Sequence, residues 1–165
     1  MGNSTAGEFQ LADVVGSIPS FSGALISKNS NQNLLDDSMN NLLIWGSEIY
    51  DTNNYHDNFI NNSRLTIPAG VKWAKVKASV HLQSGTTGSL WTIRFRLNGS
   101  TAFTGNIEIN RQDETGGQYT IIYVETPILP VSTGDYFEVE VDNGDPSALL
   151  VYAHTGTWFS IETFA

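Results

Sequence analysis

Alternation of apolar and polar residues with a period of two is the feature that most constrains the fold of this chain. In residues 71–82, Ala, Val and Leu at every second position alternate mainly with Lys, Ser and His. Residues 90–97 and 136–142 repeat the pattern, with Arg, Thr, Glu or Asp on the polar side. Such segments are typical of antiparallel strands that bury one face. No stretch shows a helical period, so the sequence predicts an all-β protein.

Turn signals divide the chain into short strands. Asn98-Gly99 predicts a hairpin turn, because both positions tolerate a positive φ, and residues 101–108 are expected to return as the next strand. The whole pattern predicts about eight to ten strands in an antiparallel sandwich or jelly roll. A chain of 165 residues fits one such domain, which we expect at residues 21–165.

Two segments, residues 118–126 and 148–154, are apolar on both faces. A two-layer sandwich covers only one face of each sheet, so a second apolar face indicates contact with another subunit. Aromatic residues are enriched in such interfaces. The sequence therefore predicts a subunit interface that contains Tyr119, Tyr123, Tyr152 and Trp158.

Residues 1–20 differ from the rest of the chain and are expected to form an N-terminal arm. The segment has low complexity and no strong period, and a terminal segment of this kind is ordered only when a surface holds it. We therefore expect its scattered apolar residues to bind a partner. These residues are Phe9, Leu11, Val14, Val15 and Ile18.

Charge and composition argue against several classes of protein. The net charge is −9, and every charged residue after Arg111 is acidic, so binding to nucleic acid or to anionic lipid is not expected. The basic residues gather in the middle third, where we expect them to meet acidic strands. The absence of cysteine excludes disulfides and thiolate chemistry. Residues 1–10 lack a signal-peptide pattern, and no apolar run approaches the roughly 18 residues of a membrane span, so assembly in the cytoplasm is expected.

The sequence contains no pattern that places a catalytic or metal-binding site. His56-Asp57 is the most enzyme-like pair, but it stands in an Asn-rich loop, where it is predicted to fix local turns. His81 and His154 lie on expected strands, and three copies of one of them around a symmetry axis remain an alternative metal site. Phosphate loops, nucleophile elbows and zinc-protease motifs are absent from the sequence. We therefore predict a non-enzymatic protein without a cofactor, a metal or catalytic residues.

Several stretches together resemble the C1q/TNF-like jelly-roll family. The matching residues are Tyr50-Asp51-Thr52, His56-Asp57, residues 61–70, the first expected strand at 21–25 and the last at 156–161. The resemblance covers about residues 21–165. It implies ten strands in two sheets and a compact homotrimer around a three-fold axis. The sequence Ser-Arg-Leu-Thr-Ile-Pro-Ala-Gly at residues 63–70 resembles the corresponding sequences of tailed-phage structural proteins.

Three functions follow as hypotheses. The first is a trimeric capsid decoration or cement protein on the head surface of a phage virion, whose arm binds the major capsid protein or another virion protein by strand addition. The second is the receptor- or host-glycan-binding tip of a tail or head fibre, where exposed aromatic rings stack on sugars. The short segment before the domain favours decoration. The third, a secreted C1q-like or cytokine-like ligand, requires a signal peptide that the sequence lacks.

Overall fold

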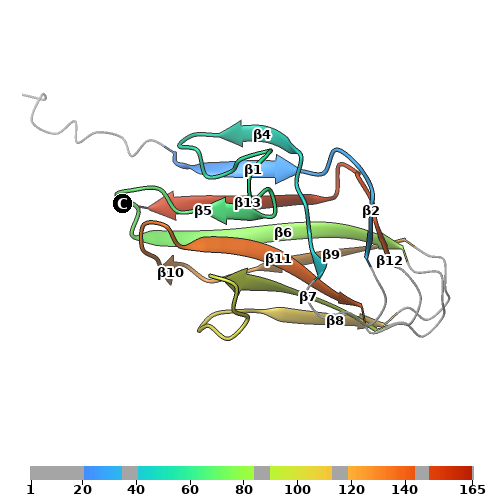
Figure 1. Ribbon diagram of the computed structural model, residues 1–165. Coiled ribbons are helices and arrows are strands. Elements are labelled where there is room, and N and C mark those ends of the chain that lie inside the picture. The colour runs from blue at the N-terminus through green and yellow to red at the C-terminus, as the bar shows by residue number, and fades with distance from the viewer. Residues whose placement is uncertain (1–20, 35–40, 84–89, 113–118, 144–148, 165) are drawn as a thin grey trace, which may run out of the picture.

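Two antiparallel β-sheets packed face to face make up the structure (Figure 1). It is a computed structural model that describes residues 21–34, 41–83, 90–112, 119–143 and 149–164. Within these residues there is no helix long and apolar enough to span a membrane. The predicted all-β antiparallel jelly-roll sandwich is confirmed.

The larger sheet, sheet A, is organised around its longest strand, β6. Its strands are β1 (Gly23–Ser27), β2 (Gln32–Leu34), β4 (Ser47–Asp51), β6 (Trp73–Gln83), β9 (Tyr119–Glu125), β10 (Leu129–Pro130), β12 (Leu149–Val151) and β13 (Trp158–Phe164). The registers place β13 and β12 along one side of β6, and β9 and β10 along the other. β1 and then β4 continue the sheet beyond β13, so β4 and β9 are edge strands.

The smaller sheet, sheet B, runs in the order β3-β11-β7-β8, with β5 also paired to β11. Its strands are β3 (Asn41–Leu42), β5 (Arg64–Thr66), β7 (Leu90–Leu97), β8 (Glu108–Gln112) and β11 (Tyr136–Asn143). The described residues contain more strands than the expected ten, because several segments of two or three residues pair separately with the long strands.

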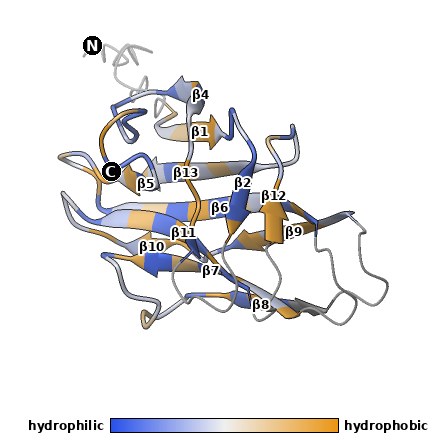
Figure 2. Ribbon diagram, turned by 45° about the vertical axis from the view of Figure 1, so that its right-hand side comes forward, coloured by the Kyte–Doolittle hydropathy of each residue, from blue (hydrophilic) through white to orange (hydrophobic). Residues whose placement is uncertain are grey.

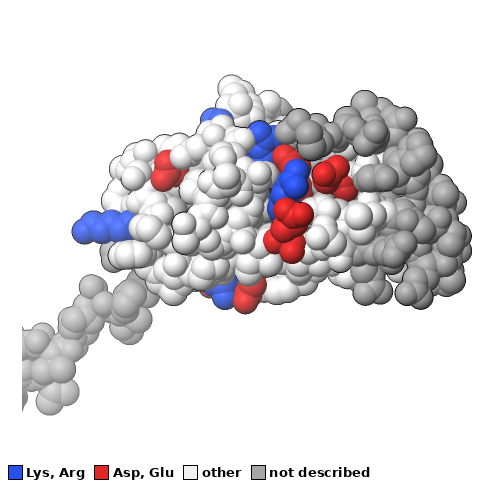
Figure 3. Space-filling model, turned by 90° about the horizontal axis from the view of Figure 1, so that it is seen from below, with Lys and Arg blue, Asp and Glu red and all other residues white. Residues whose placement is uncertain are grey.

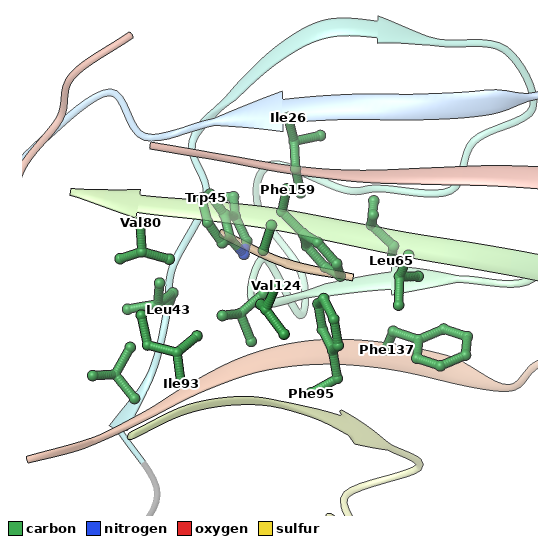
Figure 4. Packing of buried hydrophobic residues seen from close by; sticks show 14 of the residues in the cluster. Ile26, Leu43, Trp45, Leu65, Val80, Ile93, Phe95, Val124, Phe137 and Phe159 are labelled. Carbon is green, nitrogen blue, oxygen red and sulfur yellow. The ribbon is translucent and has the colours of Figure 1, made fainter. Parts of the chain in front are cut away.

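The core between the sheets is built from the residues that the period of two predicts. The alternate apolar residues of β6, β7 and β11 are buried, apart from the half-buried Leu97 at the end of β7. At the centre, the ring of Phe159 lies 5.7 Å from Trp45 and 6.0 Å from Phe95, measured between centroids (Figure 4). Each fully buried side chain of this size contributes about 1.5–3 kcal/mol, so these contacts across the sandwich hold the two sheets together.

The hairpin after β7 confirms one expectation and corrects another. Asn98 and Gly99 both have a positive φ, 52° and 78°, as the predicted turn requires. The predicted return strand at residues 101–108 is wrong, because β8 begins only at Glu108. The residues between the turn and β8 bend instead, and the side-chain amide of Asn106 donates to the carbonyl of Thr101 at 2.7 Å.

The charges of sheet B pair within the fold, as expected for the basic middle strands. Arg94 Nε donates to Glu140 Oε1 at 2.7 Å, and Arg96 Nη1 donates to Glu140 Oε2 at 3.1 Å. Glu138 accepts from the Ser63 hydroxyl at 2.7 Å. Both glutamates point outward from β11, yet both are buried, because neighbouring side chains cover them. Figure 3 shows basic and acidic side chains intermixed rather than gathered into a patch of one sign.

Lys28, just after β1, is buried between neutral partners. Its Nζ donates to Gln32 Oε1 at 2.7 Å and to the carbonyl of Ile44 at 2.8 Å, and it lies 5.9 Å from the ring centroid of Trp45. Neither hydrogen-bond acceptor carries a charge. Burial therefore lowers the pKa of Lys28 to about 8, because the ammonium loses its water and gains no anion.

Replacing Lys28 with Met is expected to change how stability depends on pH. The pKa of Lys28 falls from its ordinary value of 10.5, which applies to the unfolded chain, to about 8 in the folded protein. Between these two pH values the unfolded chain therefore binds more protons than the folded protein. The unfolding free energy of the parent protein therefore rises with pH across this window, and Lys28→Met removes that rise. Urea unfolding of both proteins from about pH 7 to pH 10 measures the difference. Identical pH profiles would contradict a buried ammonium at this position.

Candidate self-association surface

The outer face of sheet A, directed away from sheet B, brings the four predicted interface residues together. Tyr119 and Tyr123 project from β9, Trp158 projects from β13, and Tyr152 directly follows β12. The ring centroids of Tyr119 and Tyr152 lie 5.2 Å apart, and those of Tyr123 and Trp158 lie 6.0 Å apart. Ser79 of β6 is the register partner of both Tyr123 and Trp158, and its small side chain leaves room for the two rings to meet. Their role in an interface stays a prediction.

Further apolar residues extend this surface, and they were not singled out from the sequence. Ile121 lies between the two tyrosines on β9 and is 57% exposed. Trp73 and Phe164 are also exposed, and they pair in register at one end of β6 and β13. β12 and part of β9 carry the hydrophobic colour in Figure 2, although in β12 the side chains of Leu149 and Val151 are buried in the core and do not contribute to this surface. The alternation within β6 and β13 is the signal that places Trp73 and Phe164 on this face.

We call the surface formed by these residues the aromatic face: Tyr119, Ile121, Tyr123, Tyr152 and Trp158. Contiguous exposed apolar surface of this kind marks interaction sites in soluble proteins. Aromatic side chains in particular are enriched in the buried centres of protein interfaces. The arrangement is therefore suited to contact with another protein surface.

Charged residues next to the aromatic face neutralise one another. Lys75 Nζ lies 3.0 Å from Glu125 Oε2, and Lys77 forms an ion pair with Glu162 on β13. The Tyr123 hydroxyl donates to Glu125 Oε2 at 2.7 Å. Burial and this neighbouring carboxylate raise the pKa of Tyr123 to about 12, so the phenol stays neutral. Contact with another subunit would thus cover paired charges rather than single ones.

His81 and His154 meet at one end of the same face, although the expected strand position is correct only for His81, because β12 ends at Val151 and His154 lies in the following bend. The ring centroids of His81 and His154 lie 4.7 Å apart, and Nδ1 of His81 is buried without a hydrogen-bond partner. Burial, and then the neighbouring His154, lower the pKa of His81. Across the described ranges, no group of three or more His, Asp or Glu side chains could hold a metal ion. A site with one histidine from each of three copies stays a prediction.

The His56-Asp57 pair is a structural part of its loop. The ring of His56 is buried, with Nδ1 3.1 Å from Glu48 Oε1. Asp57 Oδ1 accepts hydrogen bonds from the backbone N–H groups of Phe59 at 2.8 Å and Ile60 at 3.0 Å. The turn-fixing interpretation is therefore confirmed for Asp57, whereas the His56 ring contacts Glu48 of β4.

The predicted arm lies outside the described residues. This applies to each of its candidate partner-binding residues, which are Phe9, Leu11, Val14, Val15 and Ile18. Their role stays a prediction.

Comparison with known proteins identifies the fold. The sequence matches no protein-family model, and it matches no curated protein. Among solved structures, Eiger TNF from S. frugiperda is similar over 88% of this chain and 93% of that chain, with 9% sequence identity and a TM-score of 0.56. Murine APRIL at pH 5.0 is similar over 87% of this chain and 99% of that chain, with 10% identity and a TM-score of 0.58.

Both likenesses extend over most of the chain. The C1q/TNF-like jelly roll that the sequence resemblance implied is therefore confirmed as the fold. At 9% and 10% identity the likeness establishes the fold alone, so function has to be argued from this chain's own surfaces.

Proposed function

We propose that this chain is a non-enzymatic structural protein that assembles as a homotrimer through the aromatic face. The observation that supports the proposal is the exposure of three neighbouring large side chains of β9. Tyr119 is 61% exposed, Ile121 57% and Tyr123 46%, while Ile122 and Val124 on the other side of the strand are buried in the core. One strand thus offers apolar side chains to both of its faces, and a two-layer sandwich covers only one of them.

Three copies are favoured over two by the resemblance to the C1q/TNF-like family, which implies a three-fold axis. The aromatic face also lies toward one edge of sheet A, since three of its five residues project from edge strand β9 and the other two lie across β6. An off-centre face can meet a different part of the neighbouring copy. Such head-to-tail contacts close into a ring when the rotation between copies suits it.

We further propose that the trimer is a decoration or cement protein on the head of a tailed-phage virion, assembled in the host cytoplasm. The support is the resemblance of residues 63–70 to phage structural proteins. In the structure these residues include β5 and the turn into β6, where Gly70 has a φ of 88°. The major capsid protein or another virion protein is the proposed partner of residues 1–20.

A second candidate function is supported by the ring cluster at one end of the aromatic face. The ring of His81 lies 5.3 Å from Tyr119, 5.5 Å from Tyr152 and 4.7 Å from His154. Flat aromatic surfaces with nearby polar atoms suit the stacking of sugar rings. A fibre tip that binds a host glycan is therefore the alternative, and it requires this cluster to remain open to solvent.

Introducing charge into the aromatic face is expected to abolish the trimer. Tyr123→Asp and Trp158→Asp each place an unpaired carboxylate in the proposed contact, where burial of a lone charge is strongly unfavourable. Light scattering is expected to give three chains for the parent protein and one chain for each variant, with unchanged far-ultraviolet circular dichroism. Ile128→Asp, at an exposed position on the loop after β9, is the matched control and should retain the trimer. A three-chain mass for both face variants would contradict the proposed interface.

Removing residues 1–19 is expected to separate assembly from virion binding. The shortened chain should still fold and form trimers, because the proposed interface lies within sheet A. Purified virions assembled with the tagged full chain should contain it, and virions assembled with the tagged shortened chain should not, as measured by quantitative mass spectrometry. Equal incorporation of the two chains would contradict the role of the arm, and absence of the full chain would contradict the virion assignment.

A further inference from the structure

The loop that joins β4 to β5 exposes two adjacent apolar side chains. Phe59 is 93% exposed and Ile60 is 67% exposed. The loop crosses from sheet A to sheet B at the β4 edge of the sandwich (Figure 1). Phe59 and Ile60 are called the apolar knob below. Single exposed apolar residues are common, but two large neighbours on one projecting loop indicate a contact surface.

Several hydrogen bonds hold the backbone beneath the knob in one conformation. Asp57 accepts from the N–H groups of both knob residues, and these two bonds, with Ile60 first, lower the pKa of the Asp57 carboxyl. The side-chain amide of Asn58 donates to Glu48 Oε1 at 2.9 Å, which ties the loop to β4. Asn61 then takes a φ of 56° and ends the turn. The knob is therefore pre-organised, which lowers the entropy that a contact would cost.

A hollow lies on the opposite edge of the sandwich. It has a volume of about 410 Å³ and is lined by Ile109 of β8 and by residues of β9, including Tyr119, Ile121 and Tyr123. β8 and β9 are the edge strands of sheets B and A on this side. Four strand spacings separate β4 from β9 in sheet A, a distance of about 19 Å. The knob of one chain is therefore too far away to fill the hollow of the same chain.

We propose that the knob of one copy packs into the hollow of the next copy in the trimer. This inference rests on the proposed self-association and names the two surfaces that join. The knob is apolar, the hollow is lined mainly by isoleucine and tyrosine side chains, and the two lie on opposite edges of one protomer. A contact between unlike patches is head-to-tail, and three such contacts close into a ring that leaves neither patch exposed. The hollow is also continuous with the aromatic face, because Tyr119, Ile121 and Tyr123 belong to both.

Disulfide trapping tests the contact, because the chain has no cysteine of its own. A protein with both Phe59→Cys and Ile121→Cys contains only the two thiols in question. Since a disulfide needs Cα atoms within about 7 Å, the two positions can be joined only between copies. Mild oxidation is expected to give covalently linked trimers on a denaturing gel, which a reductant returns to single chains. The control pair of Ile128→Cys with Ile121→Cys should give no covalent trimer.

The outcomes distinguish this contact from the proposed function. A three-chain mass in solution without the 59–121 cross-link overturns the knob contact and leaves the trimer standing. A single-chain mass for the parent protein overturns both. As a second measurement, the double variant Phe59→Asp with Ile60→Asp should raise the concentration at which trimers dissociate by at least about tenfold, with Ile128→Asp as the control. Unchanged dissociation of the double variant overturns the contact.

Discussion

The pairing of β6 with its neighbours is the constraint on which the rest of the structure depends. β13 runs along one side of β6 and β9 along the other, so this strand fixes the register of the centre of sheet A. Because side chains alternate along a strand, the same register decides which residues enter the core and which face outward. A shift by one residue would exchange Val80 with His81 and expose the core side of the strand. The same set of hydrogen bonds thus determines both the core and the proposed interface.

Much of this arrangement could be predicted from the sequence, because a period of two is a local property. The inward residues of β6, β7 and β11 follow from it, and so does the doubly apolar character of β9. Aromatic type together with strand phase was enough to select Tyr123 and Trp158, which lie on different strands and meet only through the register with β6. The pattern did not require knowledge of strand order, since outward residues of one sheet share a face wherever the strands lie.

Features that depend on tertiary contacts could not be predicted in this way. Glu140 points outward as its phase requires, but it is buried because Arg94 and Arg96 close over it. Phe59 and Ile60 stand in a polar stretch without a period, and their exposure results from the turn that Asp57 stabilises. In each case the outcome depends on side chains that come together only in the folded chain. The aromatic face could therefore be predicted from the strand pattern, whereas the apolar knob could be found only in the folded structure.

The central claim is that the aromatic face is covered by another copy of the chain in the native assembly. Hydroxyl-radical footprinting of the unmodified protein, read residue by residue by mass spectrometry, tests this most directly. Tyr119, Ile121 and Tyr123 are between 46% and 61% exposed in the single chain, and Ile128 is 56% exposed, so an uncovered face would be labelled about as readily as Ile128 after correction for intrinsic reactivity. We predict strong protection of the three β9 residues and normal labelling of Ile128. Equal labelling of all four positions would contradict it.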